Sequence, residues 1–318
     1  REIAPVLPSG AVVVNKSTVP VGSTRVVERV LGRDDVYVVS NPEFLREGSA
    51  VHDFLHPDRI VIGSEHSDAA IRVAGLFSGI QAPLIVTDPA SAETIKYASN
   101  AFLATKVSFV NAIANVCEAV GADVREVVLG MGYDKRIGFE FLKPGPGWGG
   151  SCFPKDSRAL IHIADGAGYD FDLLQGVIAV NDEQFDRVAQ KIERLAGGSV
   201  DGATVAVWGL TFKARTDDLR DSPSLEVITR LRERGARIQA FDPAVNKPIE
   251  GIDVRADAYA ACEGAAVLAV LTEWDDFRWV DFDKVKSALA QPHVVDARNL
   301  LDPAAVRRKG FTYEGIGR

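Results

Sequence analysis

The chain has 318 residues, of which 47% are hydrophobic and 25% charged, and its formal net charge is −8. This composition is typical of a globular protein with two or three domains, and the negative charge argues against generic nucleic-acid binding. Three dispersed cysteines, Cys117, Cys152 and Cys262, are too few for a disulfide framework and predict a reducing cytoplasm. We find no apolar run that looks long enough to span a bilayer, and the first residues do not resemble a signal peptide.

The first part of the chain alternates strands with a helix. Short β-branched runs, the kind that a parallel sheet buries, predict strands at 11–15, 36–40, 59–63 and 84–87. Residues 24–31 read as a crossover helix between the first two strands. A strand followed by G-x-G-x-x-G and a helix, the dinucleotide fingerprint, is not found near the start. We therefore interpret residues 1–88 as the remnant of an N-terminal Rossmann domain that lacks its first strands.

A long helical segment follows. From residue 90 to about 129, apolar residues recur at helical spacing, which predicts one long helix or a broken pair. Thr87 or Asp88 is the expected cap, with Pro89 in the first turn. The apolar stripe consists of Ile95, Ala98, Phe102, Val107, Val110, Ile113, Ala114, Cys117 and Val120. A helix of this length is typical of a spine between domains that packs against a second subunit, and Cys117 is expected in the core.

A further helix at 171–195 completes a predicted central domain, residues 89–198. A fresh α/β unit, residues 199–318, follows the glycine linker at 197–199. Its expected elements are strands at 204–208, 237–241, 266–271 and 293–296, with a helix at 223–234. This is a doubly wound topology, whose ligands bind at the carboxyl ends of the strands, so the loop at 211–220 is expected to mark a phosphate or nucleotide site.

The segment 143–156 predicts a reactive cysteine. Glycines and prolines precede Cys152, and a helix is expected to begin at Pro154. The positive end of a helix dipole favours a thiolate, so we expect a nucleophile there, against the alternative of a small buried cysteine beside a flexible loop. The formal G-x-G-x-x-G at 145–150 follows no strand and contains Pro146 and Trp148, so it is not a dinucleotide fingerprint.

Polar residues gather at positions where ligands bind. Lys96 and Asn100 share one helix face, which is either a ligand site or a solvated surface. Glu43 and Glu47 follow the strand at 36–40 and are expected at the carboxyl edge of the sheet. Asp156 lies four residues after Cys152, which places a carboxylate near the thiol. The histidines lack ligand spacing and no C-x-x-C occurs, so we predict no metal site.

Six collinear motifs carry a resemblance that covers nearly the whole chain. They lie at 14–22, 41–48, 96–100, 141–156, 209–213 and 216–223, and they closely resemble the UDP-glucose 6-dehydrogenase family. The segments FLKPG and GGSC look more like the UDP-glucose branch than the GDP-mannose or UDP-N-acetylmannosamine branches. Relative to the family, an N-terminal stretch with the glycine fingerprint is absent, so for a truncated chain we expect negligible activity. The alternatives are a GDP-mannose or UDP-N-acetyl-sugar dehydrogenase, or a UDP-sugar-binding fragment without turnover.

The resemblance implies NAD as cofactor and a four-electron oxidation of UDP-glucose to UDP-glucuronate. Cys152 would capture the C6 aldehyde as a thiohemiacetal, which is oxidised to a thioester and then hydrolysed. Lys96 would stabilise the oxyanion with help from Asn100, while Asp156 and Thr18 would position water. Glu43 is the candidate acid–base partner.

The resemblance also implies binding roles and a homodimer or higher homo-oligomer formed through the central helix. The substrate would contact Glu43, Phe44, Leu45, Arg46, Glu47, Lys96, Asn100, Arg136, Phe141, Leu142, Lys143, Pro144, Gly145, Gly149, Lys213 and Arg298. NAD would contact Thr18, Glu47, Lys155 and Arg220. Arg136 resembles an arginine donated across a dimer, whereas the alanine before Arg298 departs from the family's glycine. Lys155 and Arg220 as ordinary loop cations, and Asp156 as a first-turn residue favoured by the dipole, are the structural alternatives.

Overall fold

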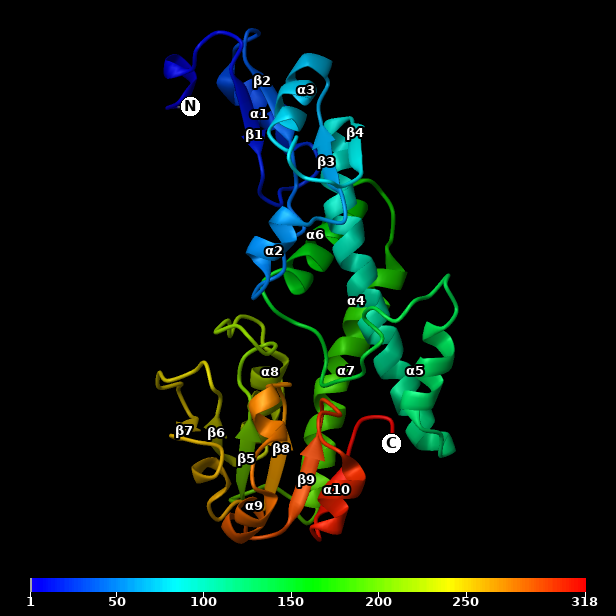
Figure 1. Ribbon diagram of the computed structural model, residues 1–318, viewed down its shortest axis with the longest axis vertical. Helices are drawn as coiled ribbons and strands as arrows, with labels where there is room; N and C mark the ends of the chain where they lie inside the picture. The colour runs from blue at the N-terminus through cyan, green and yellow to red at the C-terminus, as the bar shows by residue number, and fades with distance from the viewer. Residues whose placement is uncertain (1) are drawn as a thin grey trace. The chain divides into compact units, whose positions relative to one another are not determined.

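The computed structural model describes residues 2–318, and the chain divides into two compact units. Unit 1 comprises the chain up to Phe102 together with Asp156–Phe171. Unit 2 comprises Leu103–Lys155 and Asp172–Arg318. The helices α4 (Pro89–Val120) and α6 (Phe153–Gly166) each contribute residues to both units (Figure 1).

Unit 1 is built on a four-stranded sheet with the order β1-β2-β3-β4. The strands are β1 (Val12–Asn15), β2 (Tyr37–Ser40), β3 (Ile60–Gly63) and β4 (Leu84–Thr87). The helices outside α4 and α6 are the short η1 (Ala4–Val6), α1 (Ser23–Leu31), α2 (Ala50–Leu55) and α3 (Ser67–Gly75). The predicted strands and the crossover helix α1 are confirmed to within one residue, whereas α2 and α3 were not predicted. The pairs β1/β2 and β3/β4 are parallel, but β2 and β3 are antiparallel through Ser40 and Gly63.

Alternation along β2 gives the sheet of unit 1 a core on each face. Val38 belongs to the cluster that contains Leu31 of α1, and Val39 belongs to the cluster that contains Ala70 of α3. The end of β3 requires Gly63, because a Cβ there would lie 2.5 Å from the Cβ of Ala92 on α4. The first turn of α4 therefore packs directly against the sheet.

The predicted long helix is a broken pair. Asp88 caps α4 by accepting the backbone N–H of Ser91 at 2.9 Å. After α4 ends at Val120, Gly121 takes a left-handed φ of 75°, and Asp123 caps α5 (Val124–Gly132). The chain thus turns between two separately capped helices.

The apolar stripe predicted on α4 is only partly buried. Val110, Ala114 and Cys117 lie in the core, as predicted for Cys117. Phe102 and Val120 belong to the same apolar stripe but are exposed. The physical reason is that α4 is apolar on more than one face, and only one face meets the core of its own chain.

The length and composition of α4 correct the prediction that no apolar run is long enough to span a bilayer. Among the helices of residues 2–318, α4 alone is long and apolar enough to cross a membrane by length and composition. One third of its apolar 18-residue stretch is buried. The same helix also buries Glu93, Lys96, Asn100 and Asn111, polar side chains that hydrocarbon could not satisfy. Its polar face therefore fits a protein core rather than lipid.

Unit 2 contains a six-stranded parallel sheet with the order β10-β9-β8-β5-β6-β7. The strands are β5 (Thr204–Trp208), β6 (Arg237–Phe241), β7 (Asp253–Val254), β8 (Val267–Val270), β9 (His293–Asp296) and β10 (Thr312–Glu314). The helices after α5 and α6 are α7 (Asp172–Leu195), α8 (Pro223–Glu233), α9 (Phe282–Ala288) and α10 (Pro303–Arg308), with the short η2 (Ala260–Cys262) and η3 (Asp275–Arg278). The predicted doubly wound topology is confirmed, and its switch point lies between β5 and β8. The strands β7 and β10 and the helices α9 and α10 were not predicted.

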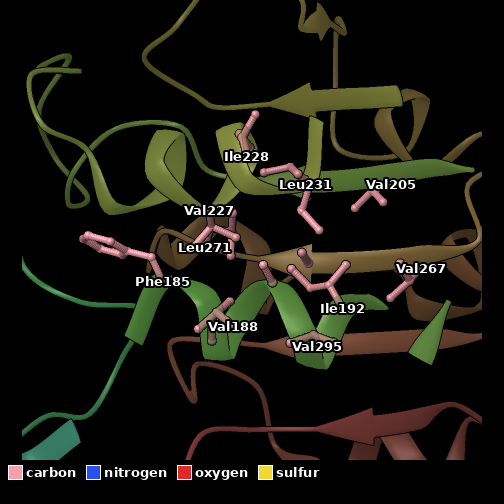
Figure 2. Close-up of a cluster of buried hydrophobic side chains, with 14 of the residues drawn as sticks. Phe185, Val188, Ile192, Val205, Val227, Ile228, Leu231, Val267, Leu271 and Val295 are labelled. Atoms are coloured by element: carbon pink, nitrogen blue, oxygen red, sulfur yellow. The ribbon is translucent and has the colours of Figure 1, made fainter. Parts of the chain in front are cut away.

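Figure 2 shows the core on one face of this sheet. Val188 and Ile192 of α7 and Leu231 of α8 lie in one buried cluster with Val205 and Val267 of the central strands. The strands are almost entirely β-branched or small, as expected for a sheet covered on both faces. This core fixes the carboxyl ends of β5 and β8, where the candidate ligand residues lie.

Candidate active site

Two predicted residues of unit 1 form a buried ion pair. The Nζ atom of Lys96 on α4 lies 3.3 Å from Oε1 of Glu43 in the loop after β2, and the Lys96 side chain is only 4% exposed. The other Glu43 oxygen accepts the backbone N–H of Leu45 at 2.6 Å. A desolvated ammonium paired with a carboxylate can stabilise a developing oxyanion or exchange a proton with it. The alternative of a solvated helix face is wrong, because Asn100 is buried as well.

Asn100 and Asp156 are also brought together. Nδ2 of Asn100 donates to Oδ2 of Asp156 at 2.6 Å. Asp156 is therefore more than a first-turn residue of α6 that the helix dipole favours. Burial, with the charges of Asp156 and Glu93, raises the pKa of the neighbouring Tyr97. One face of α4 thus carries several buried polar groups, each with a partner in another segment.

Two cations lie near the ring of Phe44. The Arg59 guanidinium lies 3.7 Å from the centroid of the Phe44 ring, and the Lys96 ammonium lies 5.4 Å from it. Phe44, Leu45 and Arg46 line a cavity of about 190 Å³ in unit 1. Arg46 itself pairs with Asp53 at 2.6 Å, and this hydrogen bond holds the pKa of the Asp53 carboxyl well below its usual range. The substrate residues predicted in this loop therefore surround a real hollow.

A residue that we did not predict anchors the loop that contains Thr18. Thr18 lies between β1 and α1, and Glu93 of α4 accepts the backbone N–H groups of Gly22 at 2.6 Å and Thr24 at 2.9 Å. The Thr24 hydroxyl donates to the same carboxylate at 2.8 Å. Glu93 is 3% exposed, so α1 begins on a buried carboxylate. Its only sequence signal was its place three residues before Lys96 on one helix face.

In unit 2, amide side chains hold the glycine loop before Cys152. Gly145 donates its N–H to Oδ1 of Asn111 at 2.8 Å and accepts from Nε2 of Gln184 at 2.9 Å. Asn181 exchanges two hydrogen bonds with the backbone of Trp148, at 2.8 and 3.0 Å. These amides on α4 and α7 were not predicted, and they give the loop one conformation.

The glycines of this loop permit close packing within the chain. A Cβ on Gly149 would lie 1.8 Å from the carbonyl oxygen of Asp221, and one on Gly150 would lie 2.9 Å from the Phe212 ring. Gly150 also donates to the Asp221 carbonyl at 3.2 Å. Glycine at these two positions is therefore required by packing within the chain.

Cys152 ends this rigid loop. It lies directly before α6, which begins at Phe153, one residue earlier than predicted. The thiol is half-buried, and its Sγ lies 3.6 Å from the Ser151 hydroxyl. Cys117 and Cys262 are buried in hydrophobic clusters. Cys152 is thus the only one of the three thiols with partial access to solvent.

Arg298 lies at the switch point of the sheet in unit 2. Its guanidinium donates to the carbonyl oxygens of Leu271, after β8, at 2.8 Å and of Phe212, after β5, at 3.1 Å. A Cβ added to Gly145 would lie 3.5 Å from Nη1 of Arg298, so these two predicted substrate residues are neighbours. The Lys213 ammonium lies 5.4 Å from the Phe212 ring centroid. The structure thus brings together Gly145, Lys213 and Arg298 around one loop.

The other predicted residues of unit 2 are more scattered. Arg136 is exposed and pairs with Asp134 at 2.6 Å, and Arg220 pairs with Asp218 at 2.8 Å. The segment Phe141–Gly145 has a left-handed Phe141, a buried Leu142, an exposed Lys143 and a half-buried Pro144. Lys155 is exposed in the first turn of α6. Within residues 2–318, no three His, Cys, Asp or Glu side chains are grouped as metal ligands would be.

Comparisons with known proteins find one family along the chain. Residues 1–81, 90–183 and 206–303 match, in turn, the NAD-binding, central and UDP-binding domains of the UDP-glucose/GDP-mannose dehydrogenase family. A UDP-glucose 6-dehydrogenase of Rhizobium meliloti (strain 1021) is 47% identical over 100% of this chain and 76% of its own length. Another, from Bacillus subtilis (strain 168), is 46% identical over 96% of this chain and 68% of its own length.

The fold is also similar to that of a solved structure from the same family. The structure of a UDP-glucose dehydrogenase from Pyrobaculum islandicum superposes with a TM-score of 0.87 at 36% identity, covering 96% of this chain and 70% of that one. Because residues 1–81 match the NAD-binding domain, the prediction that they are only a remnant of a Rossmann domain is not supported, and the negligible activity expected of a truncated chain no longer follows.

Proposed function

The chain belongs to the UDP-glucose/GDP-mannose dehydrogenase family, and we propose that it oxidises UDP-glucose to UDP-glucuronate with NAD. The observation that carries this proposal is the half-buried thiol of Cys152, held by a rigid loop at the first turn of α6. The oxidation of an alcohol to an acid needs a nucleophile, because an aldehyde has no carbinol hydride until something adds to its carbonyl carbon. The relatives at 46–47% identity are named for this reaction.

We assign the covalent steps to Cys152. When bound, NAD would supply the hydride acceptor for each of the two oxidations at C6. The Cys152 thiolate adds to the C6 aldehyde and forms a thiohemiacetal, which becomes a thioester after the second hydride has left. Water then attacks the thioester carbonyl, releasing the carboxylate and returning the thiol.

The buried polar residues of α4 and its neighbours serve the tetrahedral states. Lys96 stabilises each oxyanion, typically a contribution of about 3 kcal/mol for one donor, and Asn100 assists it. Glu43, paired with Lys96, exchanges the proton of the reacting hydroxyl. Asp156 and Thr18 position the water that attacks the thioester.

The residues of unit 1 fit a nicotinamide cofactor. Thr18 and Glu47 follow parallel strands, at the edge where doubly wound sheets bind their ligands, and the cavity of about 190 Å³ lies beside the same loops. We assign Thr18, Glu47, Lys155 and Arg220 to the cofactor. The sugar half of the substrate is assigned to Glu43–Glu47 together with Lys96 and Asn100.

The nucleotide half of the substrate is assigned to residues of unit 2. The segment Phe141–Gly145 and Gly149 present backbone groups, while Lys213 and Arg298 supply the positive charge that a diphosphate requires. Gly145 and Arg298 are neighbours, which supports a common ligand. We propose a cytoplasmic enzyme, because cysteine use favours a reducing compartment.

We propose a homodimer, or a higher homo-oligomer, that forms through α4. Phe102, Phe109 and Val116 are exposed and lie seven residues apart, so they share one face of the helix. A contiguous apolar face of this kind marks an interaction surface. Arg136 is exposed on the loop after α5 and is the residue that would enter the active site of the neighbouring subunit.

The test measures NADH formation by the purified protein. With UDP-glucose we expect two NADH per sugar, and less turnover with GDP-mannose or UDP-N-acetylmannosamine. Turnover with either of these sugars but not with UDP-glucose would replace the proposed substrate. Binding of UDP-glucose without any NADH would favour a binding protein without turnover.

Matched cysteine variants test the nucleophile. Cys152→Ala should lower kcat by about a thousandfold or more, whereas Cys117→Ala, which changes a core thiol, should leave turnover nearly intact. Melting temperatures of both variants check that they fold. Equal turnover by Cys152→Ala and the wild type would contradict the proposed chemistry.

A further inference from the structure

The sheet of unit 2 has the strand order of a dinucleotide-binding domain. In such a domain the turn after the first strand donates backbone N–H groups to a pyrophosphate, and an acidic residue beyond the second strand accepts from a ribose hydroxyl. Here the first and second strands are β5 and β6, and Asp242 follows β6. Asp242 therefore occupies the position of the ribose-binding carboxylate.

Asp242 is directed at its own chain instead. It is 1% exposed, and its Oδ2 accepts the backbone N–H groups of Leu210 at 2.7 Å and Thr211 at 3.0 Å. The same oxygen accepts from the Thr211 hydroxyl at 2.9 Å and from Nε1 of Trp274 at 3.1 Å. Its Oδ1 accepts the N–H of Ala244 at 2.9 Å. Five donors thus surround one buried carboxylate.

The carbonyl groups of the turn after β5 are also bound by the chain itself. The carbonyl oxygens of Leu210 and Thr211 accept the hydroxyls of Ser222 at 2.7 Å and Thr272 at 2.6 Å. A Cβ at Gly209 would lie 2.3 Å from that of Thr272. The donors that would face a pyrophosphate are satisfied by Asp242, and the chain itself fills the space around the turn.

The closed turn also determines where the next residues lie. Phe212 follows Thr211 directly, and its carbonyl oxygen accepts from Nη2 of Arg298 at 3.1 Å. Lys213 comes next, with its ammonium beside the Phe212 ring. A shift of Thr211 would therefore displace Lys213 and the Phe212 carbonyl, one of the three groups that hold the Arg298 guanidinium together with Leu271 and Glu273.

We propose that Asp242 is a positioning residue that closes the dinucleotide-type site of the C-terminal sheet and thereby orients Lys213 and Arg298 toward a nucleoside diphosphate. The carboxylate replaces the ligand that such a turn would otherwise bind, so this sheet takes the diphosphate through side chains and binds no dinucleotide. This inference rests on the proposed function, because Lys213 and Arg298 are assigned to UDP-glucose there.

The variant Asp242→Asn tests the inference, because it keeps the size of the side chain and removes the charge. An amide has one acceptor oxygen and brings an N–H donor against Leu210, Thr211 and Trp274. We expect the KM for UDP-glucose to rise about tenfold or more, while the KM for NAD stays within about twofold of the wild type. Asp253→Asn, which alters an exposed carboxylate of the same sheet, is the matched control and should change neither.

Two further measurements keep the test decisive. If Asp242→Asn does not fold, Trp274→Phe removes one donor to Asp242 and should raise the KM for UDP-glucose alone; Thr211→Ser, which keeps the hydroxyl, should not. Calorimetric titration of UDP into the protein reads the same effect without turnover, so the inference is tested even if UDP-glucose proves not to be oxidised.

Three results would overturn the inference. These are a folded Asp242→Asn with the UDP affinity of the wild type, an equal rise of both KM values, and the binding of two NAD molecules per chain by the wild type.

Discussion

Gly149→Ala isolates the packing role of the glycine loop. The added Cβ would lie 1.8 Å from the carbonyl oxygen of Asp221 and 2.9 Å from Cδ of Pro223. Ordinary contacts of a Cβ begin at 3.4 Å, so the two segments must separate by more than an ångström. That movement also breaks the hydrogen bond from Gly150 to Asp221.

The expected loss of unfolding free energy follows from the steric overlap and the broken hydrogen bond. Overpacking costs about 1–3 kcal/mol and one hydrogen bond about 1 kcal/mol, so we expect unfolding free energy to fall by about 2–4 kcal/mol. Urea denaturation measures this directly, and the melting temperature should fall by about 5 °C or more. Turnover should fall further than stability accounts for, because Cys152 lies three residues beyond the displaced glycine.

Gly145→Ala is the matched control for stability. It changes a glycine of the same loop, but the nearest atoms to its Cβ are 3.5 and 3.6 Å away and its φ is not left-handed. We expect its unfolding free energy to stay within about 1 kcal/mol of the wild type. Equal destabilisation by both variants would refute the argument from close packing at Gly149.

Three further predictions concern other parts of the chain. Burial raises the pKa of the Cys262 thiol to about 12, so iodoacetamide at pH 8 should alkylate Cys152 and spare Cys262 until the protein unfolds. Alkylated Cys262 in peptide mass spectrometry of the folded protein would contradict this prediction. Glu93→Gln should raise the KM for NAD and cost about 1–3 kcal/mol of stability, because an amide cannot accept all three donors; an unchanged KM would count against its anchoring of the Thr18 loop. Phe109→Asp should turn the proposed dimer into monomers, which light scattering after size-exclusion chromatography detects, and a dimer that persists in the variant would reject α4 as the interface.

The strands and the doubly wound topology could be predicted because they depend on local pattern. Runs such as Thr204–Trp208 are β-branched or apolar throughout, and their period and bounds are visible in the sequence. The helices α2, α9 and α10 have only 6 or 7 residues, so their periodicity is too brief to distinguish from a loop, whereas α3 is as long as the predicted α1 and was overlooked. Which apolar residues of α4 are buried and which are exposed could not be predicted, since the sequence cannot tell a helix face that meets the core from one that stays exposed.

Some residues of the candidate site could be predicted from the sequence and others could not. Cys152, Lys96 and Glu43 could be named because nucleophiles and ion pairs require particular side-chain chemistry next to particular elements. Asn181 and Glu93 could not, because each acts on backbone groups far away in the sequence, 33 residues for Asn181 with Trp148 and 69 for Glu93 with Thr24. Such pairings depend on how helices pack, and an isolated Asn or Glu on a helix carries no sign of its partner.

The sequence by itself determined the main alternation of strands and helices, the candidate nucleophile Cys152 and the resemblance to a dehydrogenase family. The tertiary structure alone decided that Gly149 and Gly150 serve close packing and that Asp242 is turned toward its own chain. The physical reason is that a residue's chemistry is local, whereas the partner that satisfies a buried donor or fills the space beside a glycine is chosen by the packing of distant segments.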